Sequence, residues 1–176
     1  GPGAGEKGRE GCGESGQACE HNTGPAGAKA GGKDRGGERV AGGARGVGGG
    51  EGIALAAKGR LSEGAGENLF LVLDGALHTT PASASILTGI TRHTLITLAR
   101  EEGIEVVERD LPREYLYLAD EILMCGTAAE VTPIRSVDGK TIGSGKAGPV
   151  TRRLQELFFG LFTGKTADRW GWLEPV

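Results

Sequence analysis

The sequence has few of the residues that mark several large classes of protein. Its 176 residues include three cysteines and three histidines, and aromatic side chains make up only 5% of it. Cys12, Cys19 and Cys125 are an odd number at irregular spacing, which favours reduced thiols over a disulfide scaffold or a zinc site. The histidines are equally scattered, so we expect no metal site.

Long hydrophobic runs and an excess of basic charge are also lacking. No apolar run approaches the roughly 18 residues that a membrane span requires. The first residues contain no apolar segment typical of a secretory signal. The net charge is −3 and the pI is near 5.7, which argues against nucleic acid as the main partner. We therefore expect a cytoplasmic protein that binds neither membranes nor nucleic acid.

Glycine is plentiful but unevenly distributed. Nineteen of the first fifty residues are glycine, whereas apolar residues form a clear pattern from Leu69 onward. Residues 1–28 have few large apolar side chains to bury, so we predict a disordered, glycine-rich leader there. Residues 33–50 show only a weak helical spacing, because each interior glycine costs roughly 1 kcal/mol relative to alanine. We place the start of well-ordered structure near Gly50–Ile53.

Strand and helix patterns alternate from there to the last residue. The run 69–73 predicts a buried strand, Asp74-Gly75 a tight turn, and 76–79 a returning strand with His78 on its solvent side. Further strands are expected at 51–55, 104–109, 121–125 and 131–135. Helices are expected over 91–102, from Pro112, and from Gly148 to Gly164. Ile90, Leu95, Leu98 and Ala99 are expected to form the apolar face of the first of these helices. Trp170 and Trp172 are expected to pack on a neighbouring surface.

Lys29 is the first candidate for chemistry, because only small residues flank it. A planar group can approach its amine closely, and an unprotonated lysine forms Schiff bases with aldehydes. A solvated lysine in a flexible linker is the alternative. Glu63 and Glu67 are the carboxylates nearest the strand 69–73. Each is either a satisfied loop acid or a group that holds a proton or a cation.

A second candidate lies at the start of the helix over 91–102. Thr91 can cap that helix, and the segment Gly89-Ile90-Thr91 leaves backbone N–H groups pointing outward. Such a helix N-terminus is a natural phosphate site. A plain capped helix is the alternative.

These motifs, in this order, resemble those of the branched-chain amino acid aminotransferases, fold-type IV enzymes that use pyridoxal 5′-phosphate. The resemblance is nearly continuous from Gly52 to Val176 and persists as scattered identities from Asn22 to Glu51. The segments that carry it are 29–32, 51–55, 62–70, 89–92, 126–133, 158–164 and 170–173.

The resemblance implies an α+β fold: the fold-type IV large domain, with a mixed, barrel-like sheet flanked by helices. Residues 29–176 would form this cofactor-binding portion, and a small N-terminal domain of the family would be missing. A homo-oligomer is implied, with amino acids and 2-oxo acids as its small-molecule partners.

The resemblance also implies roles for the cofactor-binding residues. Lys29 would be the catalytic residue, forming a Schiff base with pyridoxal phosphate and then moving a proton. Glu63 would face the pyridine nitrogen and keep it protonated. Gly89, Ile90 and Thr91 would bind the phosphate at the helix start.

Two residues of the segment 126–133 complete the implied site. Thr127 would add a phosphate contact, and the backbone of Thr127 and Ala128 would hold the substrate carboxylate. The implied reaction transfers an amino group between leucine, isoleucine or valine and 2-oxoglutarate.

Three alternatives remain open. A D-amino acid aminotransferase or an aminodeoxychorismate lyase would share the fold. A catalytically incompetent fragment is the third, because Asp34 stands where the family has a tyrosine and the N-terminal domain would be missing.

Overall fold

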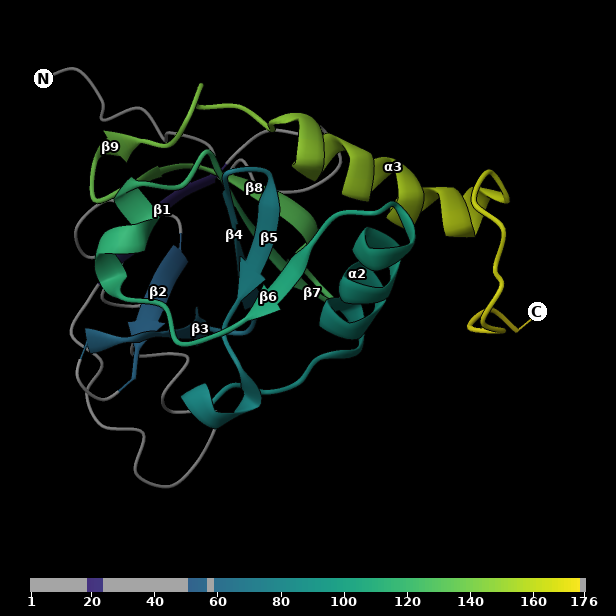
Figure 1. The fold of residues 1–176 in the computed structure, drawn as a ribbon, viewed down its shortest axis with the longest axis horizontal. Helices are drawn as coiled ribbons and strands as arrows, with labels where there is room; N and C mark the ends of the chain where they lie inside the picture. Colours follow the sequence, from purple (N-terminus) through teal and green to yellow (C-terminus); the bar gives the residue numbers. More distant parts are fainter. Residues whose placement is uncertain (1–18, 24–50, 57–58, 175–176) are drawn as a thin grey trace, which may run out of the picture.

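The computed structural model describes residues 19–23, 51–56 and 59–174, and its elements form a sheet with two long helices (Figure 1). The strands are β1 (Cys19–Thr23), β2 (Glu51–Leu55), β3 (Leu61–Gly64), β4 (Asn68–Leu73), β5 (Ala76–Thr79), β6 (Val106–Glu108), β7 (Glu121–Gly126), β8 (Glu130–Val137) and β9 (Lys140–Thr141). The helices are η2 (Ala82–Ala84), α2 (Ile90–Glu101), η3 (Arg113–Tyr117) and α3 (Pro149–Thr163).

The sheet is mixed and curls back on itself. Its strand order is β3-β2-β1-β8-β7-β4-β5-β6, with β9 paired to β8. β1 runs parallel to β2 and β8, and β5 runs parallel to β6. Beyond β6, the Leu111 carbonyl accepts a hydrogen bond from the Leu61 N–H of the opposite edge strand at 2.8 Å. The predicted α+β class with a barrel-like mixed sheet is therefore confirmed.

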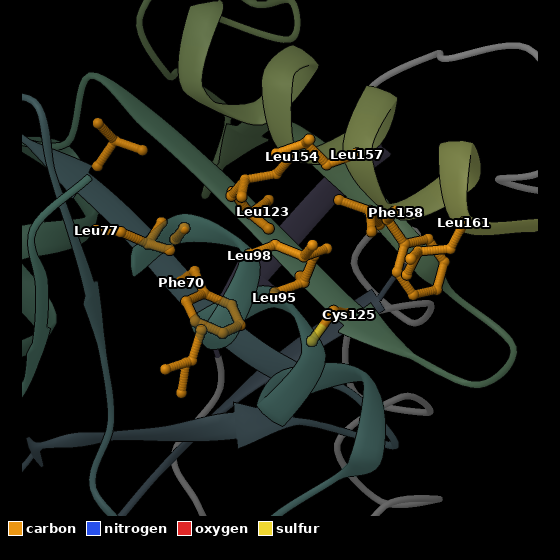
Figure 2. Close-up of a cluster of buried hydrophobic side chains, with 14 residues drawn as sticks. Phe70, Leu77, Leu95, Leu98, Leu123, Cys125, Leu154, Leu157, Phe158 and Leu161 are labelled. Carbon is orange, nitrogen blue, oxygen red and sulfur yellow. The ribbon is translucent and has the colours of Figure 1, made fainter. Parts of the chain in front are cut away.

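The central strands are apolar on both faces because each face covers a separate core. Phe70 of β4 and Leu123 of β7 belong to the core under the helices, which Figure 2 shows. Leu69 and Ile122, one residue away on the same strands, belong to a second core on the other face. This alternation explains why the run 69–73 is continuously hydrophobic, as in a strand covered on both sides.

Helices α2 and α3 pack together over the first core (Figure 1). Leu95, Leu98 and Ala99 lie on the buried face of α2, as predicted. Ile90 was expected on the same face, but that prediction is wrong, because its side chain is 78% exposed. α3 ends at Gly164, whose φ of +73° favours glycine at this position.

The tandem tryptophans of the C-terminal tail confirm another prediction. Trp170 and Trp172 stack with ring centroids 4.2 Å apart, and both pack against the core under the helices. Within the described part of the chain, no helix is both long and apolar enough to cross a membrane.

Two further local predictions were incorrect. His78 is buried at 8% exposure, and its neighbours Leu77 and Thr79 on the opposite face of β5 are buried too, so both faces of this strand are covered. Ser62 and Glu63 lie within strand β3. Cys19–Thr23 form strand β1 inside the predicted disordered leader, so that prediction is wrong for these five residues. The rest of the predicted leader and the weak helix over 33–50 lie outside the described residues.

Candidate functional site

Glu63 presents a buried carboxylate at one end of the sheet. It lies on β3 and is only 7% exposed. Its Oε2 atom accepts a hydrogen bond from the Leu87 N–H at 2.8 Å and a longer one from Asn68 Nδ2 at 3.5 Å. A buried carboxylate is costly unless it is paired or hydrogen-bonded, so these contacts fix Glu63 against the loop that leads into α2.

Asn68 joins this carboxylate to the start of helix α2. Its Nδ2 group donates to the Leu87 carbonyl at 2.7 Å, and its Oδ1 atom accepts from the Gly89 N–H at 3.3 Å. A Cβ atom on residue 89 would lie 2.8 Å from Asn68 Oδ1, so the contact requires glycine. One buried amide therefore sets the position of Glu63 relative to α2.

Asn68 was not among the residues predicted for the site. The sequence signal for it was a polar residue at the first position of an otherwise apolar strand, where a buried side chain needs hydrogen-bond partners.

The N-terminus of α2 carries backbone donors that have no partner among the described residues. Gly89 is the N-cap in an extended conformation, and it offers no side chain to accept a capping hydrogen bond from the first turn. The first helical bond runs from the His93 N–H to the Gly89 carbonyl at 3.1 Å. The N–H groups of Ile90, Thr91 and Arg92 therefore lack helical acceptors, and with the helix dipole they favour an anion.

Thr91 does not cap this helix, so that prediction was incorrect. It is the second residue of α2, inside the first turn, and it is 6% exposed. The N-cap position is taken by Gly89, which leaves the helix start without a side chain that would compete with a ligand.

The turn between β7 and β8 lies at the same end of the sheet. Pairing of Asn68 with Cys125 places the end of β7 beside the start of β4. A Cβ on Gly126 would be only 3.2 Å from the Gly66 carbonyl, so glycine allows this close approach. Thr127 and Ala128 follow in the turn, and both are exposed.

A hydrogen bond closes this turn: Thr132 Oγ1 donates to the Ala129 carbonyl at 2.6 Å. This bond restrains the turn at Ala129, while Thr127 and Ala128 face solvent.

Glu67 fits the simpler of its two interpretations. Its Oε2 atom accepts a hydrogen bond from the N–H of the preceding residue, Gly66, at 2.9 Å. Its backbone carbonyl accepts from the Gly64 N–H at 2.7 Å. These contacts are those of an acid that closes its own loop.

The sheet end thus combines a buried carboxylate, a helix start with free donors, and an exposed turn. The structure brings Glu63, Gly89, Ile90 and Thr91 together through Asn68. Thr127 and Ala128 lie at the same sheet end, whereas Lys29 lies outside the described residues.

The N–H donors of α2 and the acceptor carboxylate of Glu63 fit a ligand with an anionic group at one end and a protonated nitrogen at the other. Among the described residues, no group of three or more metal-ligating side chains gathers.

Comparison with known proteins gives consistent matches. The family model described as amino-transferase class IV matches residues 38–137. A branched-chain-amino-acid aminotransferase of Salmonella typhimurium is 57% identical over 155 residues, which is 88% of this chain and 50% of the relative. The Escherichia coli K12 relative is 56% identical over the same shares of both chains. This chain spans about half the length of the curated relatives that it matches.

Two solved structures show the same similarity. The branched-chain amino acid aminotransferase of Escherichia coli superposes with a TM-score of 0.85 at 50% identity, covering 90% of this chain and 57% of that one. The branched-chain amino acid aminotransferase of Thermobaculum terrenum, solved in its PLP-form, gives a TM-score of 0.79 at 34% identity. That match covers 86% of this chain and 53% of the other.

Proposed function

Because the chain belongs to the class IV aminotransferases, we propose that it carries the cofactor-binding half of a branched-chain amino acid aminotransferase. The reaction moves an amino group between leucine, isoleucine or valine and 2-oxoglutarate. The observation that carries this proposal is the 57% identity over 155 residues to a protein of that name. Because those 155 residues are 88% of this chain, the similarity extends well beyond the few residues of the site.

The cofactor of this proposal is pyridoxal 5′-phosphate. A relative of known structure was solved in its PLP-form, and the donors at the sheet end suit such a molecule. When bound, pyridoxal phosphate supplies an aldehyde that condenses with the amino acid and a ring that accepts electrons from Cα. The residues of this chain hold it, orient it and move protons.

Two features of the described structure support the placement of the cofactor. Glu63 offers a buried carboxylate to the pyridine nitrogen and holds a proton there by forming a charge-assisted hydrogen bond. The free N–H groups of Ile90 and Thr91, with Gly89 before them, receive the phosphate at the start of α2. Thr127 adds its hydroxyl to the same group.

The exposed turn at Thr127 and Ala128, together with Lys29, would act on the substrate. The backbone of Thr127 and Ala128 binds the substrate carboxylate through its N–H donors. With the cofactor bound, Lys29 would act as the acid/base, taking a proton from the substrate Cα and delivering it to C4′ of the cofactor. The wider assembly that we propose is a homo-oligomer in the cytoplasm.

The direct test is glutamate formation. Purified protein is incubated with leucine, 2-oxoglutarate and pyridoxal phosphate, and glutamate is measured over time. We expect turnover with leucine, isoleucine and valine, and a rate lower by about 100-fold or more for Glu63→Gln, because an amide cannot keep the ring nitrogen protonated. Glu67→Gln is the matched control, since its carboxylate only closes a loop. Turnover of D-alanine without turnover of leucine would contradict the proposal.

A further inference from the structure

A second set of buried hydrogen bonds lies beside the Glu63–Asn68 cluster and involves side chains outside the proposed binding site. Thr80 follows β5, and its Oγ1 group donates to the Ser62 carbonyl at 2.8 Å. The Ser62 hydroxyl donates in turn to the Ala84 carbonyl at 2.9 Å. Both Ser62 and Thr80 are 1% exposed. Ser62 precedes Glu63 on β3, so this chain of contacts holds the backbone that carries the site carboxylate.

Arg92 connects the same contacts to the first turn of α2. Its Nη2 group donates to the Thr80 carbonyl at 3.0 Å and to Glu108 Oε2 at 2.7 Å. The residue is 6% exposed, although arginine is rarely buried to this extent. Its Nε group has no hydrogen-bond partner among the described residues.

The buried guanidinium of Arg92 contributes little net stability to the fold. A buried guanidinium with one unpaired N–H loses hydration that its contacts do not fully replace. The same contacts are, however, well placed to fix a distance. Through Thr80, they join the strand that carries Glu63 to the helix turn that carries the Ile90 and Thr91 N–H groups.

We propose that Thr80 and Arg92 are positioning residues that set the spacing between the Glu63 carboxylate and the free N–H groups of α2. The inference rests on the proposed function, in which these two groups bind the ring nitrogen and the phosphate of one cofactor. A ligand that must reach both ends at once gains affinity only if the two ends lie at its own length apart. Ligands that reach one end alone are insensitive to that spacing.

The test therefore compares linked and unlinked ligands. The linked probe is 4-deoxypyridoxine 5′-phosphate, which carries the ring nitrogen and the phosphate but no aldehyde, so Lys29 forms no bond to it. The unlinked probes are 4-deoxypyridoxine and inorganic phosphate. Dissociation constants for all three are measured by calorimetry or competition on the wild-type protein and on its variants.

The variants are chosen to remove the connection and leave both binding ends in place. Thr80→Val removes the hydroxyl that holds Ser62 and keeps nearly the same shape. Arg92→Lys keeps the charge and loses the planar group that spans two acceptors. Thr79→Val is the matched control, because the neighbouring Thr79 hydroxyl donates at 2.8 Å to the Leu69 carbonyl of β4 rather than to β3.

We expect the linked probe to bind roughly tenfold more weakly to Thr80→Val and to Arg92→Lys, with little change for the two unlinked probes. The Thr79→Val protein should keep the wild-type ratio between linked and unlinked probes. Thr80→Val is the milder change, so it keeps the test open if Arg92→Lys fails to fold.

Several results would overturn the inference. An equal loss for inorganic phosphate would mean that Arg92 acts on the anion directly. Equal losses for all three probes, in parallel with lower thermal stability, would mean a structural role only. Unchanged affinity for the linked probe in both variants would remove the positioning role and leave the proposed function intact. Failure of the wild-type protein to bind the linked probe would instead contradict the proposed function itself.

Discussion

Replacing Asn68 with alanine tests the cluster on which the whole site depends. The amide makes two partly buried hydrogen bonds, to the Leu87 carbonyl at 2.7 Å and from the Gly89 N–H at 3.3 Å. Each such bond contributes about 1 kcal/mol net, so Asn68→Ala should lower the free energy of unfolding by about 2 kcal/mol. It should also weaken pyridoxal phosphate binding, because Glu63 and the start of α2 lose their common support.

Urea denaturation followed by far-UV circular dichroism measures the first effect. With a urea slope of roughly 2 kcal/mol per M, the midpoint should fall by about 1 M while the slope itself stays unchanged. Tyr117→Phe is the matched control: it removes the hydroxyl that donates to Asp138 Oδ2 at 2.5 Å, beyond the end of β8 that lies away from the site. It should cost about 1 kcal/mol and leave cofactor affinity unchanged.

A loss below about 0.5 kcal/mol for Asn68→Ala would show that water replaces the amide without penalty. The same stability loss with unchanged cofactor affinity would show that Asn68 supports the fold but not the site. Either result would refute the argument that one amide joins the carboxylate to the helix start.

Further predictions concern buried groups elsewhere. Burial, and after it the positive charge of Arg109, lowers the pKa of His78 below its ordinary 6.5. The unfolded chain therefore binds the extra proton, and stability should fall as pH drops below about 6.5; a His78→Gln protein should lack that part of the pH dependence in urea titrations. Gly148→Ala should destabilise by roughly 2 kcal/mol or more in the same assay, because its Cβ would lie 2.2 Å from the Glu121 carboxyl that receives the N–H groups of α3. Burial raises the pKa of the Cys125 thiol to about 12, so mass spectrometry should find it unalkylated by iodoacetamide at about pH 8 in the folded protein and alkylated in urea.

Much of the fold could be predicted because local and global preferences agree there. The run at β4, the Asp74-Gly75 turn and the helix around Leu95 have a periodicity or a turn residue that only one structure satisfies. Asp74 and Gly75 both have positive φ, as the predicted tight turn requires. Such signals depend on residues near one another in the sequence.

The incorrect predictions concern residues whose environment depends on segments far away in the sequence. His78 has a solvent-facing spacing, but β5 is an inner strand paired with β6 from a later segment, and both of its faces are buried. Ile90 has the spacing of a core residue, but it begins the helix at the exposed end. Thr91 has the chemistry of a cap, but Gly89 occupies that position because Asn68 needs the space that a side chain would fill. Each depends on an element that is distant in the sequence.

The candidate site divides in the same way. Glu63 and the segment 89–91 could be singled out because carboxylates and glycine-led helix starts have recognisable chemistry. Asn68, Thr80 and Arg92 could not, since their importance lies in which carbonyls they reach, and those carbonyls belong to other strands and loops.

The central claim is that Lys29 and the Glu63 end of the sheet serve one pyridoxal phosphate molecule. The most direct measurement is the absorption spectrum of purified protein after pyridoxal phosphate is added and excess is removed, for the wild type and for Lys29→Ala. The account predicts a band near the edge of the visible for the wild type, and its loss or displacement in the variant. The same band in both proteins would show that the lysine at position 29 takes no part in holding the cofactor.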